Sequence, residues 1–345
     1  MNSEWFKTIP EAQRDAARAS VAAVLGPHAA PSIQTVVGGV SGALTYRLDW
    51  NQSAYLMRLE TRRSPMRNPH QYACMKIASD AGIAPPLRYV DDSTGVAILD
   101  FVTQRPLGDY PGGPAALAAA VGKLAFDLQN TPAFPHLGDY RVFTERMLSF
   151  IQRGFGAGLL DPHKELFERI REAYPWDSSR HVSSHNDPNP GNILYDGQRL
   201  WLIDWETSYR NDPFTDVAIL AENFAPTTEL ETILVTSWLG APPNRFLRAR
   251  LLLMRHMTRL YYAGLLCAFT AAAPQAEPIT DLSAPTPDEF RSQLAAGVVK
   301  MGEPEMKVSL AKMLLAGFLA GSDGTAVAGG DGIALEDALA ICRAG

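Results

Sequence analysis

Residues 182–206, VSSHNDPNPGNILYDGQRLWLIDWE, join a polar loop to two short apolar runs. In this stretch Asp187 is followed five residues later by Asn192. The second apolar run, residues 200–203, ends directly at Asp204. We expect the rest of the chain to be organised around these three polar side chains.

The loop and the strands that follow should bring Asp187, Asn192 and Asp204 together. Two prolines and a glycine exclude a helix between Asp187 and Asn192, so the loop turns and both side chains can face one cleft. Residues 193–195 and 199–203 are predicted strands, joined by an Asp-Gly pair that is typical of hairpin turns. The hairpin therefore carries Asn192 at its start and Asp204 at its end.

These residue types suit phosphoryl transfer, which needs positioning and charge neutralisation more than covalent chemistry. Asp187 can accept the proton of an attacking hydroxyl group. Asn192 and Asp204 offer the oxygen ligands that Mg²⁺ prefers. His185 is expected to pack and to hydrogen-bond the loop.

Two other interpretations of the same stretch stay open. The residues could form a polar turn before a surface hairpin, with carboxylates that cap main-chain groups. Alternatively, His185 and Asp187 could be ligands of a hydrolytic metal site, since transition metals favour imidazole. No second histidine-rich motif accompanies them.

Residues 184–194 and 202–206 resemble the aminoglycoside phosphotransferase and choline kinase family, and residues 212–218 look like the next signature of that family. The resemblance covers most of the chain and is clearest over residues 36–223. It implies an α+β, protein-kinase-like fold of two lobes: a small antiparallel-sheet N-lobe (residues 1–102) and a larger, mainly helical C-lobe (residues 103–345). It also implies ATP and Mg²⁺ as cofactors. The phosphate acceptor is left open, because the family accepts many alcohols.

Composition sets wider limits. A chain of 345 residues, 46% hydrophobic and 20% charged, is typical of a soluble globular protein with one or two cores. The net charge of -6 argues against a nucleic-acid partner. There is neither a signal-peptide pattern nor a run of ~20 apolar residues for a membrane span. Three scattered cysteines fit a reducing cytoplasm.

The N-terminal third should form the sheet of the small lobe. A helix is predicted over residues 10–25, and strands over 32–37, 43–50, 54–60, 87–90 and 96–101. The first two strands are joined by a glycine-rich loop whose main-chain N–H groups could bind phosphate, namely Gly38, Gly39, Ser41 and Gly42.

Arg58 lies in the third predicted strand and alternates with apolar neighbours, so it should face away from Met57 and Leu59. Protein kinases place a lysine there to hold the ATP phosphates. An arginine can make a paired grip, and the choline kinase branch also uses one. The alternative is an ordinary solvated arginine.

A helix predicted over residues 69–81 departs from the family. The family usually has a glutamate there that pairs with the strand cation, whereas the matching residue by spacing is Gln71. Gln71 can hydrogen-bond Arg58 but cannot neutralise it. Another carboxylate, such as Glu60, could substitute.

After the sheet, Asp100, Phe101 and Val102 look like the hinge, whose main chain would hold adenine. From there the chain should be mostly helical. The predicted helices are residues 114–129, 142–155, 162–174, 213–224, 227–239, 244–272, 289–299, 304–320 and 335–343.

Side chains after Asp204 are candidates for the acceptor pocket. Trp205 and Tyr209 could surround a cationic substrate, and Glu206 and Glu222 could contact it. The alternatives are that Trp205 packs in the core and that Glu222 lies on a solvated helix face. Asp212 is expected to cap the helix that begins at residue 213.

The sequence therefore predicts an ATP- and Mg²⁺-dependent phosphotransferase acting on a hydroxyl group of a small molecule. Choline-like, ethanolamine-like, aminoglycoside-like and other alcohols all remain as acceptors. The alternative is a nucleotide-binding regulatory protein that has lost turnover, which Gln71 favours.

Overall fold

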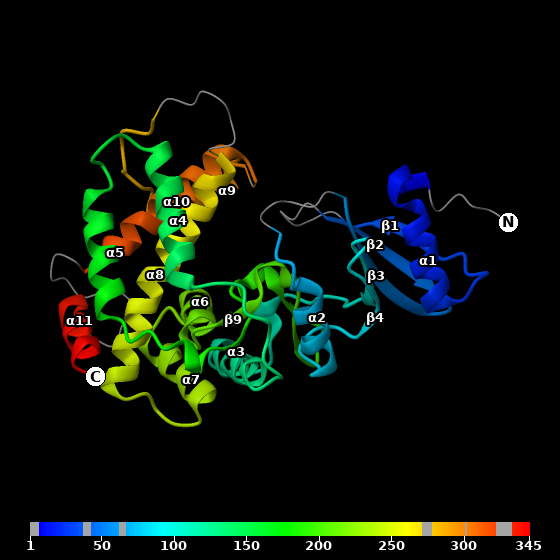
Figure 1. The fold of residues 1–345 in the computed structure, drawn as a ribbon, viewed down its shortest axis with the longest axis horizontal. Helices are drawn as coiled ribbons and strands as arrows, with labels where there is room; N and C mark the ends of the chain where they lie inside the picture. Colours follow the sequence, from blue (N-terminus) through cyan, green and yellow to red (C-terminus); the bar gives the residue numbers. More distant parts are fainter. Residues whose placement is uncertain (1–6, 37–42, 62–66, 271–277, 301, 322–332) are drawn as a thin grey trace. The chain divides into compact units, whose positions relative to one another are not determined.

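The computed structural model describes residues 7–36, 43–61, 67–270, 278–300, 302–321 and 333–345. The chain separates into two compact units (Figure 1). Unit 1 comprises Met1–Gly113, Asp127–Leu137 and Ser183–Arg210, and unit 2 comprises Pro114–Phe126, Gly138–Val182 and Asn211–Gly345. The predicted division at residue 102 places the 183–210 segment in the C-lobe, whereas by contacts this segment groups with the sheet.

Unit 1 is built on a five-stranded antiparallel sheet with the order β1-β2-β3-β5-β4. Its strands are β1 (Ser32–Thr35), β2 (Ala43–Trp50), β3 (Ser53–Glu60), β4 (Leu87–Asp91) and β5 (Val96–Asp100). Arg58 on the central strand β3 pairs in register with Thr45 on one side and Ala97 on the other. The flanking Met57 and Leu59 point into the apolar core, so the predicted alternation is confirmed.

Helix α1 (Arg14–Leu25) covers one face of the sheet (Figure 1). Ala17 and Val21 of this helix are fully buried against Leu48 and Ile98 in one apolar core. Helix α2 (Gln71–Asp80) contacts β4 and presents buried Tyr72 and Cys74 inward. Burying these apolar side chains removes them from water. This burial stabilises the fold by roughly 1.5–3 kcal/mol for each large side chain.

The 183–210 segment of unit 1 contains the predicted hairpin. Strands β7 (Ile193–Tyr195) and β8 (Leu200–Leu202) pair antiparallel. Gly197 in their turn has φ +98°, which favours glycine. The side chain of Asp196 accepts hydrogen bonds from the main-chain N–H groups of Gln198 and Arg199 at 2.7 and 2.8 Å. The short strands β6 (Val182–Ser184) and β9 (Tyr209–Asn211) form another two-stranded sheet.

Unit 2 is mainly helical. Its elements are most of α3 (Gly113–Gln129), α4 (Tyr140–Gly154), α5 (Asp161–Ala173), α6 (Phe214–Phe224), α7 (Thr228–Leu239), α8 (Arg245–Thr270), α9 (Pro287–Ala295), α10 (Pro304–Leu319) and α11 (Leu335–Ala344). Helix α8 contacts α4, α6, α10 and α11 (Figure 1). Gly264 lets α4 approach α8, since a Cβ at this position would collide with Met147.

Three arginines on α8 are buried, and each is paired. Arg250 donates to the carboxylate of Asp212 at 3.1 Å and to the hydroxyl of Tyr174 at 3.2 Å. Arg255 and Arg259 both donate to Glu222, as described below. Because a buried charge is costly unless it is paired, these contacts fix how α8 packs on its neighbours.

The structure also bears on two predictions from composition. Among the described residues, no helix combines the length and apolar character needed to cross a membrane. Cys74, Cys267 and Cys342 are all buried free thiols.

Candidate active site

The hairpin brings Asn192 and Asp204 to its open end, where Asn192 bonds to Ile203. Ile193 is in register with Leu202, and the N–H of Ile203 donates to the main-chain carbonyl of Asn192 at 3.0 Å. Asp204 is the next residue along the chain. The register of this short ladder therefore sets the spacing between the two predicted metal ligands.

Two asparagines hold the carboxylate of Asp187. Asn189 Nδ2 donates to Asp187 Oδ1 at 2.8 Å, and Asn192 Nδ2 donates to Oδ2 at 3.2 Å. Asn192 Nδ2 also donates to the main-chain carbonyl of Asp187 at 2.9 Å. With its amide nitrogen so directed, Asn192 has its Oδ1 oxygen left for a cation.

His185 is fully buried and supports the loop from behind. Its Nε2 lies 2.8 Å from the carbonyl oxygen of Ile203, and its ring packs on Trp205 with 4.8 Å between centroids. Burial lowers the pKa of His185 to about 4. The imidazole is therefore neutral at pH 7, and Nε2 must carry the proton because a carbonyl can only accept. This matches the supporting role expected for His185.

Asp204 has an unusual backbone and an unusual environment. Its φ of 65° and ψ of 73° lie in the left-handed region, which non-glycine residues rarely adopt. Burial raises the pKa of Asp204, and the positive charge of Arg58 opposes that rise. The Asp204 carboxylate makes no hydrogen bond with the described residues, so a cation would satisfy it.

Arg58 is paired with Glu206 rather than with Gln71 or Glu60. Its side chain is only 8% exposed, against 39% for Glu206. One guanidinium nitrogen, Nη2, donates to Glu206 Oε1, while Nη1 is buried and has no partner among the described residues. A buried donor without a partner costs free energy, and a phosphate oxygen could supply the missing acceptor.

The expected partners of Arg58 are occupied elsewhere. Gln71 donates to the carboxylate of Glu60, and Arg67 Nε donates to both Glu60 oxygens at 2.9 and 3.0 Å. Arg67 also pairs with Asp92. The idea that Gln71 or Glu60 contacts Arg58 is therefore wrong, because Arg67 takes the charge of Glu60.

Several hydrogen bonds connect the segment after Asp204 to the loop that carries Asp187. Asn186 Nδ2 donates to the carbonyls of Thr207 at 3.0 Å and Tyr209 at 3.3 Å. In return, Thr207 Oγ1 donates to the carbonyl of His185 at 3.0 Å. Asn68, just before α2, donates to the Ser208 carbonyl at 2.6 Å. The three segments therefore support one another.

The predicted hinge follows β5, but its first N–H groups are taken. The N–H of Asp100 donates to the Pro86 carbonyl and that of Phe101 to the Ala54 carbonyl, both at 2.9 Å. The Asp100 carboxylate pairs with Arg88, and the Phe101 ring lies under Arg47. Among the described residues, the N–H of Val102 has no acceptor, so it is the available donor of the three.

Of the side chains predicted for the acceptor pocket, three belong to unit 1 and one, Glu222, belongs to unit 2. Trp205 and Tyr209 are 2% and 4% exposed, so their rings belong to the core of unit 1, as the alternative for Trp205 holds. Glu222, in unit 2, accepts from Arg255 at 3.0 and 2.9 Å and from Arg259 at 3.0 and 2.9 Å. Glu206, in unit 1, is engaged by Arg58.

Asp212 caps α6 as expected, because its Oδ1 accepts from the N–H of Phe214 at 2.9 Å. Its second role, the buried pair with Arg250, was not predicted. Gly38, Gly39, Ser41 and Gly42 lie outside the described residues, so the phosphate loop stays a prediction.

Sequence reasoning missed the role of Asn189 and the hydrogen bonds that Asn186 donates to the segment after Asp204. Both are inside the opening motif, where an asparagine two residues from a carboxylate is a recognisable local hydrogen-bonding pattern. The described residues hold no cluster of three histidine, cysteine or acidic side chains around one point. A Mg²⁺ site needs only one or two protein oxygens, the rest coming from water and phosphate.

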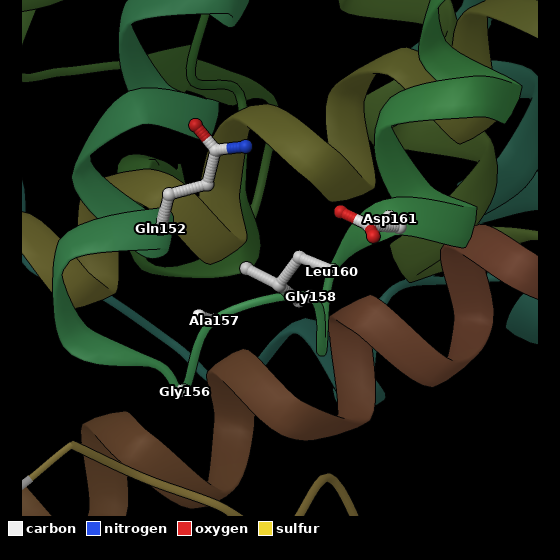
Figure 2. A pocket seen from close by; sticks show the side chains of 6 residues that line it. All are labelled: Gln152, Gly156, Ala157, Gly158, Leu160 and Asp161. Atoms are coloured by element: carbon white, nitrogen blue, oxygen red, sulfur yellow. The ribbon is translucent and has the colours of Figure 1, made fainter.

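A small cavity of about 170 Å³ lies in unit 2 between α4 and α5. Figure 2 shows Gln152 and Asp161 rising from the two helices, with the turn at 156–158 between them. None of the predicted site residues lines it, and its walls offer no pair of groups suited to phosphoryl transfer.

The chain is similar in sequence to known proteins. Residues 32–251 match the profile of a phosphotransferase enzyme family. An uncharacterized protein of Metamycoplasma hominis is 32% identical over 119 residues, which are 33% of this chain and only 23% of that protein.

Solved structures show the fold. A choline/ethanolamine kinase family protein of Mesorhizobium loti has a TM-score of 0.66 at 19% identity, covering 96% of this chain and 99% of its own. A choline kinase of Cryptosporidium parvum has a TM-score of 0.66 at 12% identity, with 90% and 95% covered. A choline kinase of Streptococcus pneumoniae, solved with AMP, has a TM-score of 0.56 at 12% identity, with 88% and 98% covered. The predicted α+β, protein-kinase-like fold is confirmed.

Proposed function

Because the chain belongs to the phosphotransferase enzyme family, we propose that it transfers the terminal phosphoryl group of ATP to a hydroxyl group of a small molecule, with Mg²⁺ bound. The observation that carries this proposal is the Asp187 carboxylate, fixed by Asn189 and Asn192 at the mouth of the hairpin that ends in Asp204. The Asp187 carboxylate is positioned to accept a proton. The Asp204 carboxylate is buried and makes no hydrogen bond with the described residues.

For ATP, the supporting features are Arg58 and the hinge. Among the described residues, Nη1 of Arg58 and the N–H of Val102 have no hydrogen-bond partner. The first suits a phosphate oxygen, and the second suits a ring nitrogen of adenine. The structurally similar choline kinase of Streptococcus pneumoniae was solved with AMP. The glycine-rich loop at residues 38–42 is proposed as a phosphate-binding loop from the sequence alone.

For Mg²⁺, Asn192 Oδ1 and the Asp204 carboxylate are the proposed ligands. Both are hard oxygen donors, and burial makes an unpaired Asp204 costly. When bound, the ion neutralises charge on the transferring phosphates.

Asp187 is the proposed general base. Its two oxygens are oriented by neutral amide donors, and the carboxylate is proposed to accept the proton of the acceptor hydroxyl. Asn189 and Asn192 act through this orientation, and His185 maintains the loop that carries it. Positioning of this kind supplies most of the rate in phosphoryl transfer.

The acceptor is proposed only as a class, a small alcohol. Choline-like and ethanolamine-like alcohols come first, because the similar structures carry those names. The buried rings of Trp205 and Tyr209 give no support to an aromatic cage in unit 1. We also propose a cytoplasmic enzyme, since ATP and three free buried thiols fit a reducing compartment.

The experiment is a screen for ADP formation from ATP and Mg²⁺ against a panel of alcohols, with the phosphorylated product identified by ³¹P NMR. The panel should include choline, ethanolamine, aminoglycosides, thiamine, homoserine and sugars. Turnover that depends on one alcohol and is lost in Asp187→Asn supports the proposal. Turnover that survives in Asp187→Asn contradicts the role of Asp187.

The alternative is a regulatory protein that binds nucleotide without turnover. It was favoured by Gln71, which cannot neutralise Arg58. Arg58 has a carboxylate partner in Glu206, so that reason no longer applies. ATP binding without turnover against the whole panel would return the alternative to first place.

A further inference from the structure

Arg58 needs a fixed orientation if it is to bind phosphate, and the contacts show which group can fix it. Arg58 stands on the central strand of the sheet, with its side chain 8% exposed. Burial removes water as a competitor, so the ion pair with Glu206, together with the nearby Tyr72 hydroxyl, orients the guanidinium. Glu206 contacts Nη2, and Nη1 has no hydrogen-bond partner among the residues that the structure describes.

The carboxylate nearest in sequence cannot take this role. Glu60 lies two residues from Arg58 on the same strand, but Arg67 grips both of its oxygens and Gln71 donates to one of them. Arg67 is in turn held by Asp92. Glu60, Gln71, Arg67 and Asp92 thus form a network of their own that does not include Arg58. In this network Gln71 bonds to Glu60 and is not a partner of Arg58.

The main chain that carries Glu206 is held in place by hydrogen bonds. It is the middle residue of the short 3-10 helix Trp205–Thr207. Thr207 is hydrogen-bonded in both directions to the loop before Asp187, and the Ser208 carbonyl accepts from Asn68 at 2.6 Å. Thr207 and Ser208 therefore connect the main chain of Glu206 to the loop of the proposed base and to the segment just before α2.

We propose that Glu206 is the positioning residue for Arg58, in place of a carboxylate on helix α2, and that it presents Nη1 to the phosphates of ATP. This inference rests on the proposed function. It assigns to the segment that carries the metal ligand Asp204 a second role, the orientation of the phosphate-binding cation. Asp204 and Glu206 are two residues apart. One short turn therefore sets the position of the proposed metal ligand and of the residue that orients Arg58.

Two opposing effects decide whether removing Glu206 weakens or strengthens ATP binding. Removing Glu206 takes away a negative charge near the phosphates, which favours ATP, but it also releases Arg58, which disfavours ATP. Glu206 is 39% exposed, so water and salt screen its repulsion. Arg58 is buried, and its direct phosphate contact is hardly screened. Loss of orientation should therefore dominate, and ATP affinity should fall.

The test is a double-mutant cycle on ATP affinity, measured by calorimetry with and without Mg²⁺. The variants are Glu206→Ala, Arg58→Ala and the double variant, with Glu206→Gln and Glu206→Asp as conservative changes. Glu206→Ala should weaken ATP binding about tenfold, the scale of one charge-assisted hydrogen bond. Glu206→Gln should lose less because it keeps a neutral acceptor, and Glu206→Asp should recover part of the affinity.

The decisive comparison is in the Arg58→Ala background. If Glu206 acts through Arg58, Glu206→Ala causes no further loss there. The same cycle on urea unfolding of the nucleotide-free protein should show the coupling of the ion pair directly. A control should leave ATP affinity unchanged: Glu336→Gln in the exposed pair with Arg169.

Each other outcome identifies a different error. A loss confined to Mg²⁺ conditions, or additive losses in the double variant, would make Glu206 a direct ligand and overturn the positioning role. Tighter binding in Glu206→Ala would show that repulsion dominates and would also overturn it. Failure of the wild-type protein to bind ATP at all would refute the proposed function itself, and this inference with it.

Discussion

Asn192 uses one amide nitrogen to contact both the main-chain carbonyl and the carboxylate of Asp187, at 2.9 and 3.2 Å. The same side chain thereby links the proposed general base to the proposed metal site. Because its donor group is committed, its oxygen is the only side-chain atom left for Mg²⁺. A change at Asn192 would disturb both functions, so Asp187 and Asp204 are the better positions at which to separate them.

Asp187→Asn should lower turnover by ~10²–10⁴-fold, because the amide cannot accept the hydroxyl proton. Nucleotide affinity should change little, since Asp187 is not among the proposed ATP contacts. Steady-state kinetics with the identified acceptor, together with ATP calorimetry, checks both halves. Asp80→Asn is a suitable control, because Asp80 is an exposed partner of Lys76 on α2 and should keep full turnover.

Asp204→Asn should abolish the gain in ATP affinity that Mg²⁺ provides, because both remaining oxygen ligands would be neutral and weak. Asparagine tolerates the left-handed backbone of residue 204, so the fold should survive. Calorimetry with ATP in the presence and absence of Mg²⁺ measures the gain. An undiminished gain would mean that another carboxylate holds the ion.

Arg250→Met should destabilise unit 2 by ~3–5 kcal/mol, because it leaves the Asp212 carboxylate buried without its cation. Asp212 is 2% exposed, and burial raises the pKa of its carboxyl group while Arg250 opposes the rise. Urea unfolding gives the free energy. The matched control is Arg245→Met on the same helix, whose Asp337 partner lies 3.7 Å away in an exposed pair worth at most ~1 kcal/mol. Similar losses for the two variants would refute the argument from burial.

His256 should make stability depend on pH. Its Nδ1 donates to the Phe318 carbonyl at 2.6 Å, and burial, assisted by the charges of Arg259 and Arg255, lowers its pKa to about 4. The unfolded chain, with an ordinary pKa near ~6.5, binds the proton first as pH falls. The stabilisation is therefore complete above ~6.5 and is lost as pH falls toward 4.

Between pH 7 and pH 5 this histidine should cost the wild-type protein about 2 kcal/mol of unfolding free energy, by the linkage relation. Urea unfolding at the two pH values should show a smaller loss for His256→Gln. His28→Gln, which changes an exposed histidine, should behave as wild type. An equal loss in all three proteins would assign the pH dependence to other groups.

Much of the fold could be predicted because local patterns determine it. The strand predicted at residues 43–50 matches β2, and the hairpin after Asn192 forms at the Asp-Gly turn. Strands β6 and β9 were missed because each has three residues and no turn signal joins them, whereas β7 and β8, equally short, flank an Asp-Gly turn. Helix α8 was found because its apolar length is unusual, although nothing in that length reveals which acids its arginines meet.

The site could be predicted in part. Asp187, Asn192 and Asp204 lie within one short motif, so the spacing alone brings them near each other. Arg58 and Glu206 are 148 positions apart, and no local pattern reports a contact over that distance. The rings at Trp205 and Tyr209 were ambiguous for a different reason: an aromatic side chain suits a ligand cage and a core equally well, and only burial decides between them.

The buried arginines of α8 have a consequence for motion. Arg250 holds Asp212 at the start of α6, while Arg255 and Arg259 hold Glu222 near its end. Helix α6 is thus fastened to α8 at both ends, and it cannot slide or rotate without separating buried charges. Its amide protons should exchange with deuterated solvent only when the whole of unit 2 opens, at the same slow rate as those in the middle of α8.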